Sequence, residues 1–217
     1  MSNTEYGVYL VTGADLSAGR TTVEIVEAAI RGGVDVIQLR EKHASARKRY
    51  ELGRELRAMT RDVGVPLIVN DRVDIARAID ADGVHLGDDD LPIEVAREQL
   101  GPDAIVGRSV STPDAAREAE RSGADYLGVG AVYHTSSKDV DPDEHGIGTE
   151  TVREIRETVS VPFVGIGGIT AENAAEVVSA GADGVAVISA ITAADDPEVA
   201  TRALGEAVES ARGRIDV

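Results

Sequence analysis

Short apolar segments rich in β-branched residues alternate along the chain with longer segments whose apolar residues recur at helical spacing. The short segments are residues 7–11, 34–39, 65–69, 83–86, 104–106, 126–129, 161–166 and 184–188. The longer ones are residues 21–31, 46–62, 73–79, 93–100, 113–122, 149–158, 171–180 and 197–212. Runs of the first kind are typical of buried strands and those of the second of amphipathic helices. Strict alternation predicts a parallel sheet with a helix after each strand.

Eight strand-helix units favour closure into an α/β fold of the (β/α)8 TIM-barrel type, with residues 1–217 in a single domain. A doubly wound open sheet is the alternative, and it is disfavoured because the count reaches eight with no spare elements. Glycines stand where helices should end in a left-handed residue before the next strand. The recurring Gly-Ala/Val-Asp pattern at 33–35, 123–125 and 181–183 is assigned to the stability face of the barrel.

One strand end changes abruptly from apolar to polar residues. Read as an extended segment, residues 36–42 place Gln38, Arg40 and Lys42 on the same side. Burying an unpaired guanidinium or ammonium costs several kcal/mol, so an anion is expected there. Carboxylates of the same protein and a phosphorylated ligand are both open at this point, because Arg binds either through two parallel hydrogen bonds.

Polar residues also follow the other predicted strands, at the face where the chemistry of such barrels is found. They are Asn70 and Asp71, then His85, Asp88, Asp89 and Asp90, then Arg108 and Ser109, then residues 134–138 and 165–170, and finally Ser189. Groups able to bind phosphate and metal therefore converge on one rim. His85 is expected to pack within its strand, and His134 is given no role.

Two constellations on this rim have a functional and a structural explanation each. The Gly-Ile-Gly-Gly-Ile-Thr run (165–170) leads into a helix, so its backbone N–H groups could bind a phosphate, whereas a tight turn would also require glycine. Asp71 and the acidic run 88–90 could bind Mg²⁺, or they could belong to a surface salt-bridge network. We favour phosphate and Mg²⁺.

Composition narrows the class of partner. Asp and Glu number 39 against 22 Lys and Arg, which gives a formal charge of −17. Such a charge repels nucleic acid and anionic membranes, so neither is expected as a partner, and a saline cytoplasm would explain it. The absence of Cys excludes disulfides and Cys-ligated zinc. No signal segment and no membrane-spanning run is evident, so a cytoplasmic location is expected.

The sequence resembles the thiamine phosphate synthase family over nearly its whole length. The matching motifs are Gln-Leu-Arg-Glu-Lys (38–42), Val-Asn-Asp-Arg (69–72), Gly-Val-His-Leu-Gly (83–87) with Asp90 before Leu-Pro, Gly-Arg-Ser (107–109), the loop 135–138 and Gly-Ile-Gly-Gly-Ile (165–169). Two departures are Thr-Ser-Ser-Lys where the family has Thr-Xaa-Thr-Lys, and Asp88 where Gln is common. Both replacements keep a hydroxyl or an oxygen acceptor.

The resemblance implies a transferase that joins 4-amino-2-methyl-5-diphosphomethylpyrimidine to a thiazole phosphate, releasing diphosphate through a dissociative, carbocation-forming step. Its two partners would be small phosphorylated heterocycles, and its cofactor Mg²⁺, held by Asp71 and Asp90. The pyrimidine diphosphate would be bound by Gln38, Arg40, Lys42, Asn70 and Lys138, with Ser109 beside the pyrimidine. The thiazole phosphate would be bound by Thr135, Ser137, Gly168, Ile188 and Ser189. Leu39, Glu41 and Ser136 would be further substrate-binding residues. Arg40, Lys42, Ser109 and Lys138 would act in catalysis.

Further expectations concern the loop, the rivals and the assembly. The loop 135–148 is long for such a connection and is expected to close over the substrates. A thiazole tautomerase of the same fold is one rival, although it should not need Asp71, Asp90, Arg40 and Lys42 together. A non-catalytic barrel that binds a phosphorylated metabolite is the other. A homo-oligomer is possible.

Overall fold

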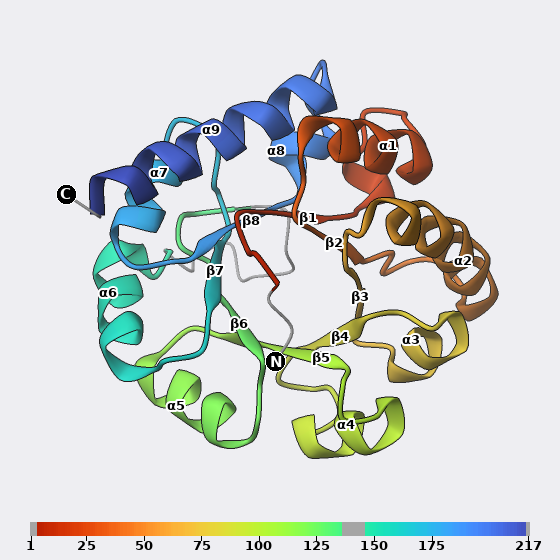
Figure 1. Ribbon diagram of the computed structural model, residues 1–217, viewed down its shortest axis with the longest axis horizontal. Coiled ribbons are helices and arrows are strands. Elements are labelled where there is room, and N and C mark those ends of the chain that lie inside the picture. The colour runs from red at the N-terminus through yellow and green to blue at the C-terminus, as the bar shows by residue number, and fades with distance from the viewer. Residues whose placement is uncertain (1–3, 136–145, 216–217) are drawn as a thin grey trace.

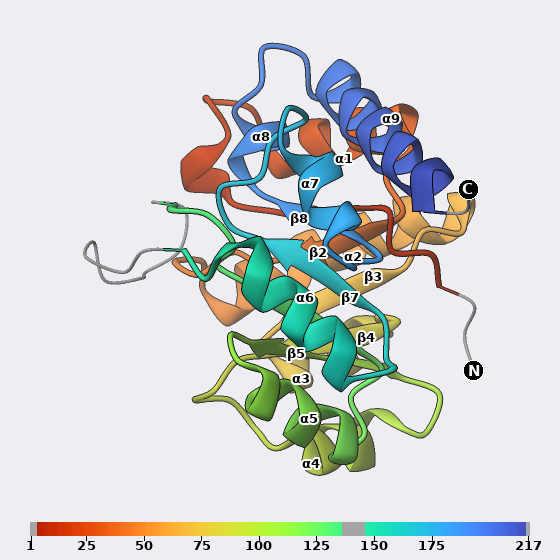
Figure 2. The same ribbon diagram turned by 90° about the vertical axis from the view of Figure 1, so that its left-hand side faces the viewer.

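The computed structural model describes residues 4–135 and 146–215, and its eight strands form a closed parallel barrel in chain order. Closure is made by β8 pairing with β1, where Val185 lies opposite Val8. Helices surround the barrel (Figure 1). Seen from the side, the strand carboxyl ends face left and both chain ends lie to the right (Figure 2). The barrel predicted from the alternating pattern is confirmed.

The strands are β1 Val8–Val11, β2 Val36–Leu39, β3 Leu67–Asn70, β4 Gly83–Leu86, β5 Ile105–Val110, β6 Tyr126–Gly130, β7 Phe163–Ile166 and β8 Gly184–Val187. The helices are α1 Thr22–Gly32, α2 Ala46–Val63, α3 Val73–Ile79, α4 Ile93–Leu100, α5 Pro113–Arg121, α6 Gly148–Thr158, α7 Ala174–Ser179, α8 Ser189–Thr192 and α9 Pro197–Ile215, with a 3₁₀ turn η1 at Ala14–Leu16. Among residues 4–135 and 146–215, no helix has the length and apolar character needed to cross a lipid bilayer.

Some boundaries differ from those predicted. β5 continues beyond residue 106, because Arg108 and Ser109 stay in the ladder opposite Leu127 and Gly128 of β6. These two polar residues therefore lie within the strand and not after it. α7 is shorter than the predicted 171–180 because its first turn is replaced by one in which the Asn173 side chain accepts a bond from the Thr170 N–H. The short elements η1 and α8 had no periodic signal in the sequence.

The core has two parts, one between the sheet and the helices and one inside the barrel. The outer part is aliphatic, as the composition predicts. The inner part also holds Tyr6, Tyr9 and Tyr126, of which Tyr6 and Tyr126 stack with ring centroids 5.0 Å apart. Three of the five tyrosines of the chain are thus concentrated within the barrel.

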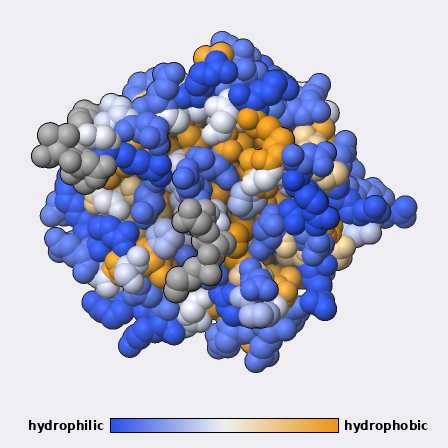
Figure 3. Space-filling view, in the orientation of Figure 1, coloured by the Kyte–Doolittle hydropathy of each residue, from blue (hydrophilic) through white to orange (hydrophobic). Residues whose placement is uncertain are grey.

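Four aspartates join neighbouring strands by hydrogen bonds at the amino-terminal rim of the barrel. Asp35, Asp82, Asp125 and Asp183 each precede an even-numbered strand. Their Oδ2 atoms accept the backbone N–H of Val8, Leu67, Val106 and Phe163 on the preceding strands, at 2.7, 2.8, 2.7 and 2.9 Å. The Gly-Ala/Val-Asp pattern therefore serves the scaffold, as expected, and Asp82 adds a fourth member. This face is largely hydrophilic over the helices, with small apolar patches between them (Figure 3).

Candidate active site

A small cavity opens at the carboxyl-terminal mouth of the barrel, above the buried tyrosines. Five of the predicted site residues line it, on three strands and two strand ends: Gln38, Arg40, Asn70, Ser109 and Ile188. Tyr9, His85 and Tyr126 line the same cavity from below. The strand ends thus bring an amide, a guanidinium and a hydroxyl to one place, although the residues lie up to 150 positions apart in the chain.

A second cavity, of about 210 Å³, adjoins the first between the ends of β7 and β8. Ile166, Ala186 and Ile188 line both cavities, so the two lie side by side. The predicted thiazole-phosphate residues that line the second cavity are Thr135, Gly168, Ile188 and Ser189. The candidate residues that line the cavities thus fall into two adjoining groups, with Ile188 common to both.

The glycine-rich loop after β7 is shaped by the chain that it packs against. Gly167 and Gly168 have φ angles of +104° and +63°, a region that favours glycine. A Cβ at Gly167 would lie 2.6 Å from the Ala131 Cβ, and one at Gly168 would lie 2.6 Å from the His134 carbonyl oxygen. Close packing and backbone conformation thus explain why Gly167 and Gly168 are glycines, which agrees with the interpretation of this run as a tight turn. A phosphate site remains a prediction, and the same loop lines the second cavity.

Asp71 and Asp90 lie side by side at the ends of β3 and β4. The pKa of Asp71 is raised to about 6, mainly by burial and further by a hydrogen bond with Asp90 and repulsion from it, while Lys42 and Arg40 lower it in part. Asp71 also has a φ of +62°, uncommon outside glycine, and backbone of this kind is often found at functional sites. The Gly87 N–H donates to the Asp90 carboxylate at 2.6 Å. Two crowded carboxylates beside two cations form a place where a divalent cation would relieve repulsion.

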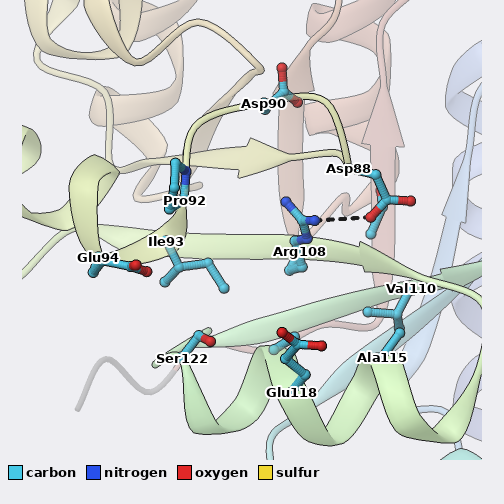
Figure 4. A pocket seen from close by; sticks show the side chains of 12 residues that line it. Asp88, Asp90, Pro92, Ile93, Glu94, Arg108, Val110, Ala115, Glu118 and Ser122 are labelled. Carbon is cyan, nitrogen blue, oxygen red and sulfur yellow. Dashed lines mark hydrogen bonds and ion pairs between the residues drawn. The ribbon is translucent and has the colours of Figure 1, made fainter.

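The other members of the acidic run are placed differently. Asp88 forms an ion pair with Arg108 at 2.9 Å, and Asp88 is largely exposed. Figure 4 shows this pair across a cavity of about 340 Å³ between β5, α4 and α5, with Asp90 directed away from Arg108. The salt-bridge explanation therefore applies to Asp88. In the described ranges no group of three or more His, Cys, Asp or Glu residues could hold a metal ion, so Asp71 and Asp90 would need oxygen atoms from a substrate or water to complete one.

The loop after β2 is held from beneath. The Glu41 carboxylate is buried and accepts bonds from the Thr12 and Thr22 hydroxyls at 3.1 and 2.9 Å and from the Ala14 N–H at 3.2 Å. Arg49 donates to the carbonyl oxygens of Glu41 and Lys42. This support fixes the backbone that carries the two cations of the loop.

Of the Gln-Leu-Arg-Glu-Lys motif, Lys42 lines neither of the two cavities, and Leu39 and Glu41 are directed elsewhere. Leu39 is 2% exposed and lies in the aliphatic core between sheet and helices. The Glu41 side chain is engaged with the first loop of the barrel. Neither lines the two mouth cavities. Their place in the motif is explained by the strand alternation, which turns every second side chain away from the barrel interior.

Of the remaining predicted residues, some lie within the described ranges and others lie outside them. Ser136, Ser137 and Lys138, with most of the loop expected to close, lie outside the described residues. His134 is exposed. The sequence analysis did not single out Tyr9 or Tyr126, which line the mouth cavity. The signal available was an aromatic residue at an inward position of an otherwise aliphatic strand.

A closed (β/α)8 barrel with two adjoining cavities at the carboxyl ends of its strands places the molecule among barrel proteins that act on small ligands at this face. The family model described as thiamine monophosphate synthase matches residues 8–191. The chain belongs to this family, whose members are transferases of thiamine biosynthesis.

Similar proteins agree with this assignment. A thiamine-phosphate synthase of Natronomonas pharaonis is 75% identical over 94% of this chain and 96% of that protein. One from Haloarcula marismortui is 64% identical over 96% and 99% of the two chains. Among solved structures, a thiamine phosphate pyrophosphorylase from Pyrococcus furiosus superimposes with a TM-score of 0.87 at 45% identity, covering 96% of this chain and 98% of that one.

Proposed function

We propose that this chain joins 4-amino-2-methyl-5-diphosphomethylpyrimidine to 4-methyl-5-(2-phosphoethyl)thiazole, giving thiamine phosphate and diphosphate, or to the carboxylated form of that thiazole, with CO₂ released as well. The observation that carries the proposal is the pair of adjoining cavities, one lined by Arg40 and the other by the glycine-rich loop. Family membership supports the same reaction. The bond broken joins the pyrimidine methylene carbon to a diphosphate oxygen, and the bond formed joins that carbon to the thiazole nitrogen.

The pyrimidine diphosphate would occupy the mouth cavity. Gln38, Asn70 and Ser109 would bind its ring, and Arg40 and Lys42 its phosphates. Asp71 and Asp90 would hold Mg²⁺, which when bound supplies positive charge to the diphosphate oxygens. The closeness of Asp71 and Asp90 supports this assignment: burial is the main cause of the raised pKa of Asp71, and the hydrogen bond with Asp90 and repulsion from it raise that pKa further.

The thiazole phosphate would occupy the second cavity, with its phosphate near Gly168 and Ser189. Thr135, Ser136 and Ser137 would contribute hydroxyl groups, and Lys138 would stabilise the leaving diphosphate. The protein would orient both partners and stabilise charge as it develops, so that no strong general base is needed. Closure of the loop 135–148 would keep water from the carbocation.

The test is incubation of the purified protein with both substrates and Mg²⁺, in high and low KCl, with product and diphosphate measured separately. Thiamine phosphate with one diphosphate per turnover is expected, and the acidic surface predicts more activity in high KCl. Isomerised thiazole carboxylate alone would indicate the tautomerase, and binding without turnover a sensor. Arg40→Met should abolish most turnover. Arg47→Met on the exposed face of α2 is the matched control, because its side chain is 88% exposed.

A further inference from the structure

A continuous chain of hydrogen bonds crosses the interior of the barrel from Gln38 to Ser109. The Gln38 Nε2 donates to the Tyr9 hydroxyl at 2.8 Å, and the Tyr9 and Tyr126 hydroxyls are 2.7 Å apart. Tyr126 lies 2.9 Å from Nδ1 of His85, and Nε2 of His85 lies 2.9 Å from the Ser109 Oγ. Both ends of this chain line the mouth cavity.

The direction of each bond follows from the inventory of protons. Tyr9 has one hydroxyl proton, and it already accepts a bond from Gln38. Among the described residues its other hydrogen-bond partner is Tyr126, so the Tyr9 proton is donated to the Tyr126 oxygen. The reverse direction would leave a buried hydroxyl donor without an acceptor, which proteins avoid.

The same rule applies to the rest of the chain. Tyr126 accepts from Tyr9, so its own proton is donated to Nδ1 of His85. His85 then carries its single proton on Nε2 and donates it to the Ser109 oxygen. Burial raises the pKa of both tyrosines, which keeps each phenol protonated and able to donate.

We propose that Tyr9, Tyr126 and His85 are positioning residues that fix Ser109 as a hydrogen-bond donor to the substrate, and Gln38 as an acceptor. With its oxygen engaged by His85, the Ser109 hydroxyl has its proton available for a molecule in the cavity. With its nitrogen engaged by Tyr9, the Gln38 amide offers its oxygen. The direction of each hydrogen bond in the chain sets the direction of the next. Whether Ser109 donates to the substrate and whether Gln38 accepts from it therefore depend on each other.

This arrangement deepens the proposed function, on which it rests, by stating what the mouth cavity selects. It fits a heterocycle that carries both an amine, which donates to Gln38, and a ring nitrogen without a proton, which accepts from Ser109. An oxo-pyrimidine presents the opposite pattern, an oxygen acceptor and a protonated nitrogen. The chain of hydrogen bonds from Gln38 to Ser109 would therefore favour binding of an aminopyrimidine over binding of its oxo analogue.

The first experiment reads the proton order directly, in the unliganded protein. The chain has four histidines. In a variant with the other three changed to Gln, ¹⁵N-labelled His85 gives an imidazole NMR signal that reports its tautomer near neutral pH. A neutral ring with the proton on Nε2 is expected. A proton on Nδ1, or on both nitrogens, would overturn the proposal, whatever the activity of the protein.

The second experiment is a double-mutant cycle of Tyr126→Phe and Ser109→Ala. Tyr126→Phe should raise the KM for the pyrimidine diphosphate roughly five- to tenfold, the effect of one hydrogen bond, and should shift the His85 signal. In the Ser109→Ala background its effect on KM should be smaller, because only the part that acts through Tyr9 and Gln38 remains. Tyr50→Phe, which removes a hydroxyl on α2, is the control. Equal effects in both backgrounds would show that Tyr126 does not act through Ser109.

The two outcomes separate this inference from the proposed function. If the wild-type chain makes no thiamine phosphate, the proposed function fails, and the NMR signal still decides the proton order. If turnover is found and His85 is protonated on Nδ1, the proposed function stands and the proposed direction of the hydrogen bonds is wrong. Should Tyr126→Phe not fold, Tyr9→Phe replaces it, with a smaller shift of the His85 signal expected because Tyr126 still donates to Nδ1.

Discussion

Aspartates lie at both ends of this barrel, and the two ends use them in opposite ways. At the amino-terminal rim the carboxylate of Asp82 accepts the Leu67 N–H at 2.8 Å and pairs with Arg57 at 2.7 Å. At the carboxyl-terminal rim Asp71 and Asp90 face each other, and the pKa of Asp71 is raised to about 6. The first arrangement satisfies charge within the protein. The second places two carboxylates against each other, which is the arrangement we propose for a metal site.

This difference teaches how stability and function are divided within one barrel. Carboxylates that accept backbone N–H groups join neighbouring strands and stabilise the closed sheet. Two adjacent carboxylates repel each other and destabilise the unliganded protein, and a bound cation would relieve this repulsion. Each rim can therefore be altered with little effect on the other, and four predictions test this separation.

The largest effect is expected from Asp71→Asn. Loss of a metal-binding carboxylate should lower kcat/KM by at least about 100-fold, while removal of the repulsion from Asp90 should leave the unliganded protein as stable or raise its Tm by about 2 °C. The measurements are steady-state kinetics and thermal unfolding without Mg²⁺. A large fall in Tm would show that Asp71 serves the fold instead.

The converse is expected from Asp82→Ala. It removes the acceptor of the Leu67 N–H and leaves Arg57, only 16% exposed in its side chain, without its ion pair. We expect a loss of about 2 kcal/mol in the free energy of unfolding, with kcat per folded molecule unchanged. Asp82→Asn keeps the acceptor and should lose about half as much. Denaturant unfolding and kinetics on the same samples would check this, and a changed kcat would break the separation.

Two glycines with positive φ provide a third comparison. Gly123 at the amino-terminal rim has a φ of +88° and open space around it, whereas a Cβ at Gly168 would meet the His134 carbonyl oxygen. Gly123→Ala should lower stability by about 1 kcal/mol without changing any KM. Gly168→Ala should also raise the KM for the thiazole phosphate about tenfold, because it reshapes the second cavity. Equal KM values for the two variants would argue against a phosphate site there.

The smallest effect is expected from pH. In the proposed site Mg²⁺ would displace the proton of Asp71, so the apparent affinity for Mg²⁺ should fall about tenfold as the pH drops from 7 to 5, and this dependence should weaken in Asp71→Asn. The folded pKa is above the unfolded value of about 3.9, so the stability gained from this proton is full below about pH 4 and is lost as the pH rises through 6. Mg²⁺ titration and urea unfolding across this range would detect both trends, and a flat Mg²⁺ profile would contradict the first.

Much of the fold and part of the site could be predicted from the sequence, since both depend on local order. Alternation of apolar runs placed all eight strands, and because parallel strands end on one face, it placed Gln38, Asn70 and Asp71 on the same rim. Leu39 and Glu41 could not be separated from their neighbours in the motif without the direction of each side chain. Arg108 and Ser109 were expected after β5 because polar residues usually end a buried strand, and here the open barrel mouth accommodates them.

The sequence by itself determined the barrel, the family resemblance and the rim that carries the chemistry, because periodicity and motif spacing are properties of the chain order. The tertiary structure alone decided which carboxylates repel and which are satisfied, and it joined Tyr9, Tyr126, His85 and Ser109 into one chain of bonds. These contacts link residues up to 117 positions apart. Their strength depends on distance, burial and proton direction, which exist only once the sheet has closed.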